Sequence, residues 1–98
     1  MCFVIFEWDP EKNEKIKSER GISFEEIALL LGVGSIWAVT KHWNPQKYPN
    51  QRIFLIPVDG QIVAVPFVQD EERIFLKTAF VSRKMTKQYR DEQNETNR

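Results

Sequence analysis

The chain has 98 residues, 42% of them hydrophobic, which is enough for one modest core and too short for two stable domains. Fourteen basic and fourteen acidic side chains cancel, so any contact with nucleic acid has to come from a local cluster of charge. A single cysteine, Cys2, excludes an intramolecular disulfide. The apolar run Cys2–Phe6 is too short for a signal peptide, and every other apolar run is interrupted by charge or proline, so we expect a cytoplasmic protein with no membrane contact.

The chain opens with a strand followed by a charged helix. Residues 2–8 are rich in β-branched and aromatic side chains, which predicts the strand. Asp9 suits a helix N-cap and Pro10 the first turn, so a helix is expected over 10–20, ended by Gly21. Ile16 is its only clearly apolar residue, and the helix is therefore expected to lie on the surface.

A second helix is predicted from the capping-box spacing of Ser23 and Glu26. Its apolar face packs on a sheet, and Gly32 and Gly34 end it. A strand is expected over 35–40, followed by a polar loop over 41–51.

Three apolar runs then predict an antiparallel meander, over 53–58, 61–68 and 73–82. Asp59-Gly60 is a two-residue hairpin turn that pairs Val58 with Gln61. That register puts Pro57 and Pro66 at positions that do not hydrogen-bond within the hairpin, so each proline should instead leave a gap or bulge on the outer side of its strand. Because residues 53–56 are all apolar, this strand should be covered on both faces and lie near the sheet centre.

The C-terminal residues 82–90 predict a short basic helix, with Ser82 as its possible cap. Residues 91–98 have no apolar side chain to bury, and we expect them to form a disordered tail after a single domain over 1–90. The predicted fold is α+β: a small, mainly antiparallel, twisted β-sheet with two N-terminal helices packed on it and a short C-terminal helix.

Several ordered segments resemble the BrnT family of bacterial toxins. They are Phe6–Asn13, Arg20–Glu26 and Ser82–Thr86, while Tyr48–Phe54 and Val65–Thr78 resemble a subgroup of that family. The resemblance covers roughly residues 5 to 89. It implies a RelE-like fold, metal-independent RNA cleavage as a type II toxin, and neutralisation by an antitoxin from an adjacent gene, expected to carry a ribbon-helix-helix DNA-binding domain.

The chain also departs from the family pattern at two places. Glu19-Arg20 stands where many relatives have lysine–histidine before the glycine, and Lys87-Gln88-Tyr89 follows Thr86 without the glutamate that is often found there. A histidine at the position of Arg20 could act as a general base, whereas Arg20 stays protonated and can only stabilise charge.

Metal-free RNA cleavage needs a 2′-hydroxyl that loses its proton, cations that stabilise the transition state and a proton for the leaving oxygen. The candidate cations are Arg83, Lys84, Lys77, Arg52 and Arg20. Convergence of the first four on one face or end of the sheet is one possible arrangement, and the sequence does not fix which of them converge. For Arg83 and Lys84, contact with phosphate, contact with the antitoxin and a solvated helix start all remain open.

Three further side chains are candidates for substrate binding: His42, Trp43 and Tyr89. His42 is the one side chain whose ordinary pKa allows proton exchange near neutrality, although a solvated loop histidine is the simpler interpretation. Trp43 belongs to an aromatic and basic stretch, 37–48, that suits stacking on unpaired RNA, an antitoxin-binding patch or ordinary core packing. Tyr89 suits proton donation, base stacking or packing under the sheet.

Other classes of enzyme lack support in the sequence. There is no cysteine–histidine metal spacing, phosphate-binding glycine loop or nucleophile elbow, and no cofactor is implied. Glu7 and Asp9 share one face of the expected strand, but Asp9 is better explained as a helix cap. Two hypotheses remain: a messenger-RNA-cleaving toxin, and a non-catalytic toxin-fold module that binds an antitoxin or another protein.

Overall fold

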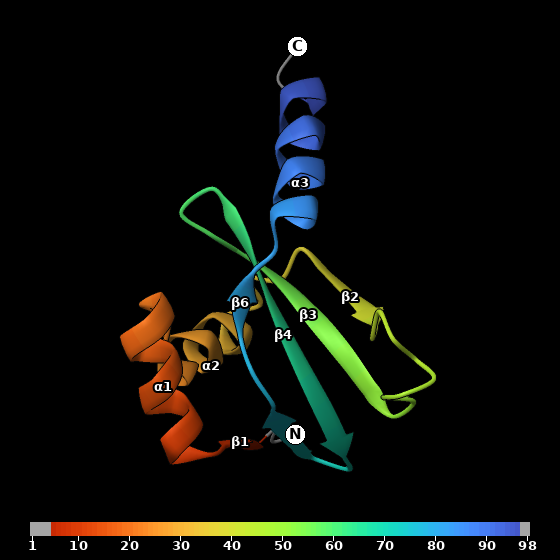
Figure 1. The fold of residues 1–98 in the computed structure, drawn as a ribbon. Helices are drawn as coiled ribbons and strands as arrows, with labels where there is room; N and C mark the ends of the chain where they lie inside the picture. The colour runs from red at the N-terminus through yellow and green to blue at the C-terminus, as the bar shows by residue number, and fades with distance from the viewer. Residues whose placement is uncertain (1–4, 97–98) are drawn as a thin grey trace.

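A computed structural model of the chain describes residues 5–96, with side chains as far as residue 93. Within that range the chain forms three helices and six strands (Figure 1). They are β1 (Ile5–Trp8), α1 (Pro10–Arg20), α2 (Phe24–Gly32), β2 (Ala38–Lys41), β3 (Gln51–Val58), β4 (Gln61–Asp70), β5 (Arg73–Leu76), β6 (Phe80–Val81) and α3 (Arg83–Thr96). Cys2 and the first residues of the predicted N-terminal strand lie outside the described residues.

The strands form one sheet in the order β1-β5-β4-β3-β2, and the two-residue strand β6 also pairs with β4. Every pairing is antiparallel except that of β1 with β5. The predicted α+β class and the mainly antiparallel sheet are therefore confirmed. The strand β3 has a neighbour on each side, as expected, and β4 is the strand with the most neighbours.

The central hairpin has the predicted register. Val58 pairs with Gln61 across a turn in which Asp59 and Gly60 both have positive φ, 51° and 78°. Such a turn matches the twist of the strands that it joins, and glycine adopts its second position without a steric cost. Both prolines take non-hydrogen-bonded positions of the hairpin: Pro57 lies opposite Ile62 and Pro66 opposite Ile53.

The predicted gap opposite Pro66 is present and is larger than a bulge. Residues 73–82, expected as one strand, divide into β5 and β6, which pair with β4 on either side of Pro66. Because Pro66 has no N–H to donate, the ladder is interrupted there, and only its carbonyl is used, accepting from the amide of Lys77 at 2.8 Å. The connector 77–79 consequently leaves the sheet at this point.

The strand expected over 35–40 begins later, at Ala38. Gly34 has φ 77° and the amide of Ile36 donates to its carbonyl, so the chain is still turning at this point. Pairing with β3 starts where the amide of Trp37 donates to the carbonyl of Leu55, at 2.8 Å. The expectation of a strand over residues 35–37 is therefore wrong: after the turn at residues 33–34 these residues are irregular, and the strand begins at Ala38.

Apolar residues cover both faces of β3 and β4, as predicted for residues 53–56. On one face Phe54 and Ile56 join the larger core cluster, to which α1 and α2 contribute Ile16, Phe24, Ile27 and Leu31. On the other face Ile53 and Leu55 join a smaller cluster, against which Met85 and Tyr89 of α3 pack. The helices α1 and α2 thus cover one face, whereas α3 starts on the other and extends beyond the end of the sheet (Figure 1).

The caps predicted for the N-terminal helices are present. A side-chain oxygen of Asp9 accepts from the amide of Glu11 at 2.9 Å, and Ser23 Oγ accepts from the amide of Glu26 at 3.2 Å. Gly21 ends α1 in the left-handed conformation, at φ 68°. These local contacts fix where both helices begin and where the first one ends.

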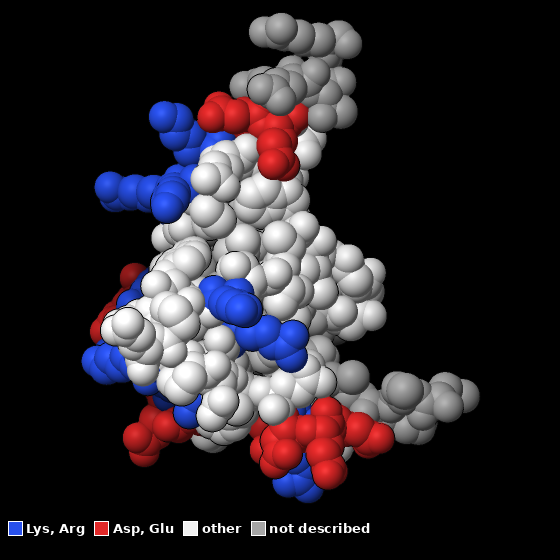
Figure 2. Space-filling view, turned by 90° about the vertical axis from the view of Figure 1, so that its right-hand side faces the viewer, with Lys and Arg blue, Asp and Glu red and all other residues white. Residues whose placement is uncertain are grey.

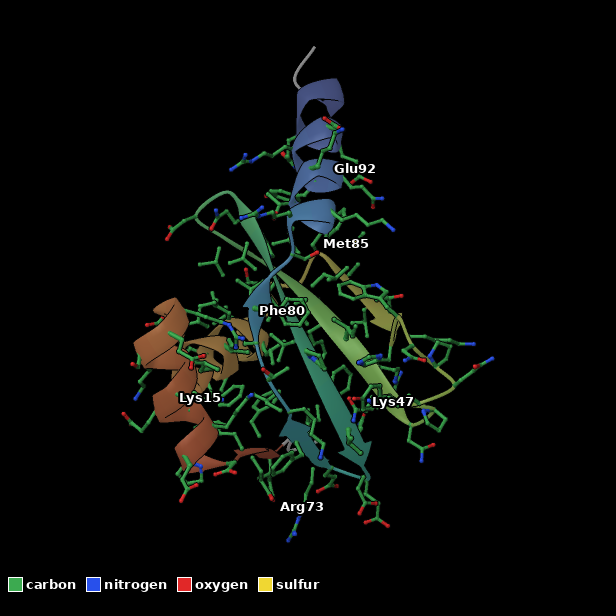
Figure 3. All side chains as sticks on the ribbon, viewed as in Figure 1. Lys15, Lys47, Arg73, Phe80, Met85 and Glu92 are labelled. Carbon is green, nitrogen blue, oxygen red and sulfur yellow. The ribbon has the colours of Figure 1, made fainter. Side chains whose placement is uncertain are left out.

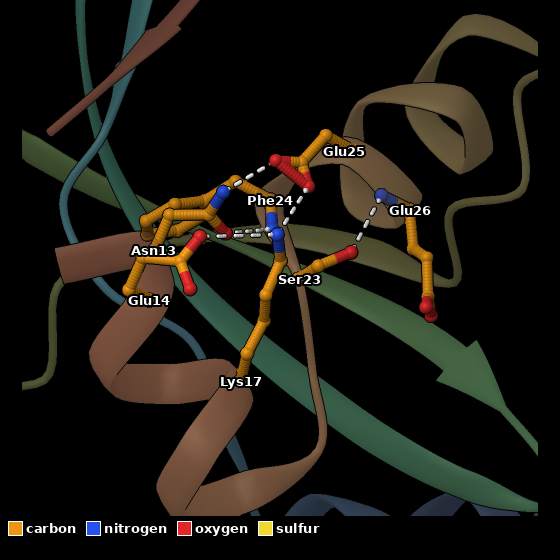
Figure 4. A network of polar contacts seen from close by, with 7 residues as sticks. All are labelled: Asn13, Glu14, Lys17, Ser23, Phe24, Glu25 and Glu26. Atoms are coloured by element: carbon orange, nitrogen blue, oxygen red, sulfur yellow. Dashed lines mark hydrogen bonds and ion pairs between the residues drawn. The ribbon is translucent and has the colours of Figure 1, made fainter. Parts of the chain in front are cut away.

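An unpredicted polar network joins α1 to α2 (Figure 4). The buried side chain of Asn13 accepts from the amide of Phe24 at 2.9 Å and donates to a carboxylate oxygen of Glu25. Lys17 also pairs with Glu25, at 3.3 Å. The hydrogen bond from Asn13, followed by that from Lys17, lowers the pKa of Glu25, and the hydrogen bond to Glu25 raises the pKa of Lys17.

The C-terminal helix is longer than expected. Ser82 Oγ accepts from the amide of Met85 at 3.3 Å, which supports the predicted cap, but α3 continues past Arg90 to Thr96. Trp37 Nε1 donates to a carboxylate oxygen of Glu92 at 3.2 Å, a tertiary contact within the segment expected as a tail. Among the described residues, no helix combines the length and apolar character needed to span a membrane.

Candidate functional site

A groove lies between the loop 42–50 and the connector 77–79, on the face of the sheet that carries the smaller core cluster. Its volume is about 510 Å³. We call it the loop groove. Its polar lining is His42, Tyr48, Gln51, Lys77 and Thr78, and its apolar lining is Trp43, Ile53, Pro66 and Phe80. Figure 3 shows Phe80 close to β4 and Lys47 at the outer edge of the loop.

Backbone hydrogen bonds hold the loop side of this groove. The amide of His42 donates to the carbonyl of Gln51 at 3.2 Å, and that of Tyr48 to Asn44 at 3.0 Å. The amide of Gln51 in turn donates to the carbonyl of Tyr48 at 3.2 Å. The opposite wall exists because Pro66 interrupts the ladder of β4 and releases Lys77 and Thr78 from the sheet.

His42 is held in a defined orientation. Its Nδ1 accepts from the amide of Asn44 at 3.0 Å, so the neutral ring carries its hydrogen on Nε2. The ring also packs on Tyr48, with centroids 4.5 Å apart. The atom that His42 offers to a ligand is therefore an Nε2–H donor.

The other side of the groove offers a cation and aromatic surface. Lys77 is exposed and its ammonium lies 5.0 Å from the centre of the Phe75 ring. The ion pairs among the described residues involve Lys17 and Arg73 as cations, so no carboxylate competes for Lys77 there. Trp43 is 50% exposed and meets Phe80 edge-on at 6.1 Å, which leaves indole surface open to a stacking ligand.

The structure does not bring the candidate cations together at one site. Arg52 lies over the Phe67 ring at 5.8 Å, on the face opposite Lys77, and donates to Gln69 at 3.3 Å. Arg20 donates to the carbonyl of Ala79 at 3.2 Å and lines a separate depression. Only Lys77 of the set lines the loop groove.

Arg83 and Lys84 also take places away from the loop groove. Arg83 lines a second groove, of about 410 Å³, together with Thr86, Lys87, Arg90 and Asp91 of α3 and with Gln61 and Val81 of the sheet. We call this the α3 groove. Lys84 is exposed on α3 and is not part of that lining.

The predicted ligand-binding residues divide in the same way. His42 and Trp43 both line the loop groove. Tyr89 is half-buried, packs edge-on against Trp37 at 5.6 Å and contacts the smaller core cluster, as the packing interpretation expected. Glu7 pairs with Arg73 at 3.6 Å and Asp9 caps α1, so neither belongs to an acid–base site.

Sequence reasoning missed Gln51, Thr78 and Phe80 as groove residues, and it treated Tyr48 only as part of an aromatic stretch. The sequence did contain a signal for them. Pro66 cannot donate a hydrogen bond to the strand beside β4, so the residues of that neighbouring strand opposite Pro66 leave the sheet and become available to line a groove. No group of three or more histidine, cysteine, aspartate or glutamate side chains suitable for a metal ion occurs in the described part of the chain. Comparison of the chain with protein families, curated proteins and solved structures gave no match.

Proposed function

We propose that this chain is the toxin of a type II toxin–antitoxin system, a metal-independent endoribonuclease that cleaves messenger RNA in the cytoplasm. The observation that carries the proposal is the loop groove. One concavity is lined there by the only histidine of the chain, by a lysine that has no ion pair among the described residues, and by an open indole surface. The resemblance to the BrnT toxins supports the same activity independently of this geometry.

Cleavage proceeds within the RNA strand itself. The 2′-oxygen of the ribose forms a bond to phosphorus while the bond from phosphorus to the 5′-oxygen breaks, leaving a 2′,3′-cyclic phosphate and a 5′-hydroxyl. The 2′-hydroxyl proton passes to water, and the 5′-oxygen receives one from water. The protein supplies position and charge: His42 Nε2–H and the Lys77 ammonium donate to the phosphate oxygens as negative charge builds on them.

The aromatic lining selects an unpaired strand. A base can stack on Trp43 only if it has left a duplex, because the faces of a paired base are covered by its neighbours. Tyr48 packs on His42 and keeps the imidazole in place, so its role is positioning. Thr78 and Gln51 line the same groove and add neutral hydrogen-bonding groups for the ribose.

The direct test is incubation of the purified protein with single-stranded RNA in the presence of a chelator. We expect cleavage to 2′,3′-cyclic phosphate ends, and a rate lowered about 10²- to 10³-fold by His42→Ala, the usual effect of losing one donor to an oxyanion. Lys77→Ala should also lower the rate, whereas Lys15→Ala, which removes an exposed lysine on α1 (Figure 3), should leave it unchanged. Equal rates for His42→Ala and the native chain would reject the assignment.

A second candidate function is a non-catalytic module that binds a protein partner. Two observations favour it: the dispersal of the five predicted cations, and an apolar depression of about 490 Å³ lined by Trp8, Ala28, Leu29, Gly32, Val33 and the edge residue Glu25. Leu29 and Val33 are 71% and 78% exposed. Leu29 lies on the side of α2 opposite its buried residues, and Val33 follows one turn later at the end of the helix, so both apolar side chains are open to a partner. A partner that covers them uses apolar contacts, as we expect of an antitoxin for a toxin of zero net charge.

Induced expression separates the two functions. If the chain is a toxin, its expression should arrest growth. The His42→Ala variant should not arrest growth, and co-expression of the protein from the adjacent gene should suppress the arrest by the native chain. Leu29→Asp should leave arrest intact and weaken the suppression. If the chain is a non-catalytic module, the native chain should not arrest growth, and Leu29→Asp should still weaken binding to the partner.

A further inference from the structure

We propose that the α3 groove is a second RNA-binding site, which holds the phosphate backbone of a single-stranded RNA away from the loop groove. The inference rests on the proposed function for the identity of the ligand. The chemical feature that the site recognises is a row of phosphates, so this part of the interaction carries no base specificity.

Three cations of α3 share the face that lines this groove. Arg83, Lys87 and Arg90 are spaced by four and by three residues, which places them above one another on a helix. At a rise of about 1.5 Å per residue, the row extends roughly 10 Å along the helix axis. A linear array of charge suits an extended polyanion better than a single small anion.

The charges in this row are available to a ligand. Neither Arg83 nor Lys87 forms an ion pair among the described residues. Arg90 donates through Nε to the carbonyl of Gly60 at 3.1 Å, which holds its guanidinium in place and leaves its two terminal nitrogens for a phosphate. Among the described residues that line the groove, Asp91 is the one carboxylate.

Charge is segregated at this end of the molecule. Figure 2 shows lysine and arginine side chains projecting from one side of its upper part, which α3 forms in Figure 1, while acidic side chains there lie toward the other side. The chain as a whole has no net charge, so this local separation is what an anion encounters.

Backbone phosphate fits this groove better than a protein surface does. Val81 is the only large apolar residue among the described residues that line it, whereas stable protein interfaces have an apolar centre. Two guanidinium groups with an ammonium between them match phosphate oxygens, which arginine binds in pairs. Phe80 lines the loop groove and Val81 lines the α3 groove, and consecutive residues of a strand point to opposite faces of the sheet, so the two grooves open on different faces.

The experiment measures binding of a fluorescently labelled single-stranded 2′-O-methyl RNA of about 12 nucleotides, a length within the range of known single-strand sites. This probe lacks the attacking 2′-hydroxyl, so binding is measured without cleavage. We compare the native chain with the double variant Arg83→Gln/Lys87→Gln. The matched control is Lys84→Gln, which removes a neighbouring charge of the same helix from outside the groove.

We expect the double variant to bind the RNA more weakly, and we expect its affinity to depend less steeply on salt concentration. Each phosphate contact with a single strand contributes about −0.7 to the slope of log K against log salt, so two lost contacts lower its magnitude by about 1.4. Lys84→Gln should keep the native slope. Equal slopes for all three proteins, an equal loss in Lys84→Gln and the double variant, or no binding by the native chain would each overturn the proposal.

Failure of this inference can be told apart from failure of the proposed function. Native-like probe binding by the double variant, together with RNA cleavage by the native chain, rejects the α3 groove and retains the enzyme. Groove-dependent binding without cleavage of ordinary RNA retains the α3 groove and rejects the enzyme. Each variant is first checked for the circular dichroism spectrum of the native chain. We expect all of them to fold, because Arg83, Lys84 and Lys87 are exposed.

Discussion

At the scale of single residues, Asn13 is the polar side chain on which the helix–helix contact depends most. It is only 4% exposed, and its Oδ1 is the acceptor for the buried amide of Phe24 at the start of α2. Its amide nitrogen in turn donates to Glu25, which also pairs with Lys17 (Figure 4). One side chain therefore satisfies a helix N-terminus and orients the carboxylate beside it.

We predict that Asn13→Ala lowers the free energy of unfolding by about 1–3 kcal/mol, because the amide of Phe24 is left buried without a partner. Denaturant unfolding measures the loss, and Lys12→Ala on the same helix is the control. Asn13 also lowers the pKa of Glu25, and that contribution is present above the unfolded-state pKa and lost as pH falls through the folded value. The deficit of Asn13→Ala should therefore shrink in acid; a deficit that grows there would contradict the network.

The sequence was sufficient to predict the helix caps, which are local contacts, but not the contact of Asn13 with α2, which is tertiary. Asp9 and Ser23 act on amides two and three residues away, so their roles follow from spacing alone. Asn13 acts on residues 24 and 25, and its contact depends on the angle between α1 and α2. Its spacing of three residues from Ile16, which puts both on one helix face, was the available signal.

At the scale of elements, the buried hydroxyl of Thr86 is one of the links between α3 and the central hairpin. Ile62 takes a position of β4 whose amide points away from β3 and beyond the reach of β6. Thr86 Oγ1 accepts from this amide at 2.8 Å and donates to the carbonyl of Ser82 at 2.6 Å. The Thr86 side chain is buried, and its hydroxyl provides the hydrogen-bond acceptor that β6 no longer provides to β4 at Ile62.

We predict that Thr86→Val, which keeps the shape and removes the hydroxyl, destabilises the protein by about 1–3 kcal/mol, while Thr86→Ser stays closer to the native chain. Thermal or denaturant unfolding of both variants measures the difference. If Thr86→Val were as stable as the native chain, the hydroxyl would not be the acceptor that the Ile62 amide requires.

The pattern of apolar residues in the sequence was sufficient to predict most of the sheet, but it predicted little of the candidate site. Alternating apolar residues, the Asp59-Gly60 turn and the two prolines were sufficient to predict the hairpin register and the interruption opposite Pro66. They did not predict that this interruption frees three residues, which is why Lys77 and Thr78 were not assigned to a wall of a groove. The break also changes which face the residues after it reach, Lys77 among them, whereas the positions of Arg20 on α1 and Arg52 on β3 do not depend on it.

At the scale of the whole molecule, β3 and β4 are the only strands among the described residues that carry buried apolar side chains on both faces over most of their length. The larger cluster depends on Phe54, Ile56, Val63 and Val65, and the smaller one on Ile53, Leu55, Ile62 and Ala64. Neither cluster can form without this hairpin. Loss of the hairpin therefore removes both cores at once, and unfolding should be cooperative.

We predict that native-state hydrogen exchange divides the molecule accordingly. The amides of Phe54, Ile56, Val63 and Val65, which occupy the hydrogen-bonded positions of the hairpin, should exchange only through global unfolding, with free energies equal to that from denaturant unfolding. The amides of α1, which buries only Asn13 and Ile16, should exchange through local opening at lower free energy, and Asn13→Ala should accelerate them further. Equal protection of α1 and the hairpin would instead place α1 in the same cooperative unit.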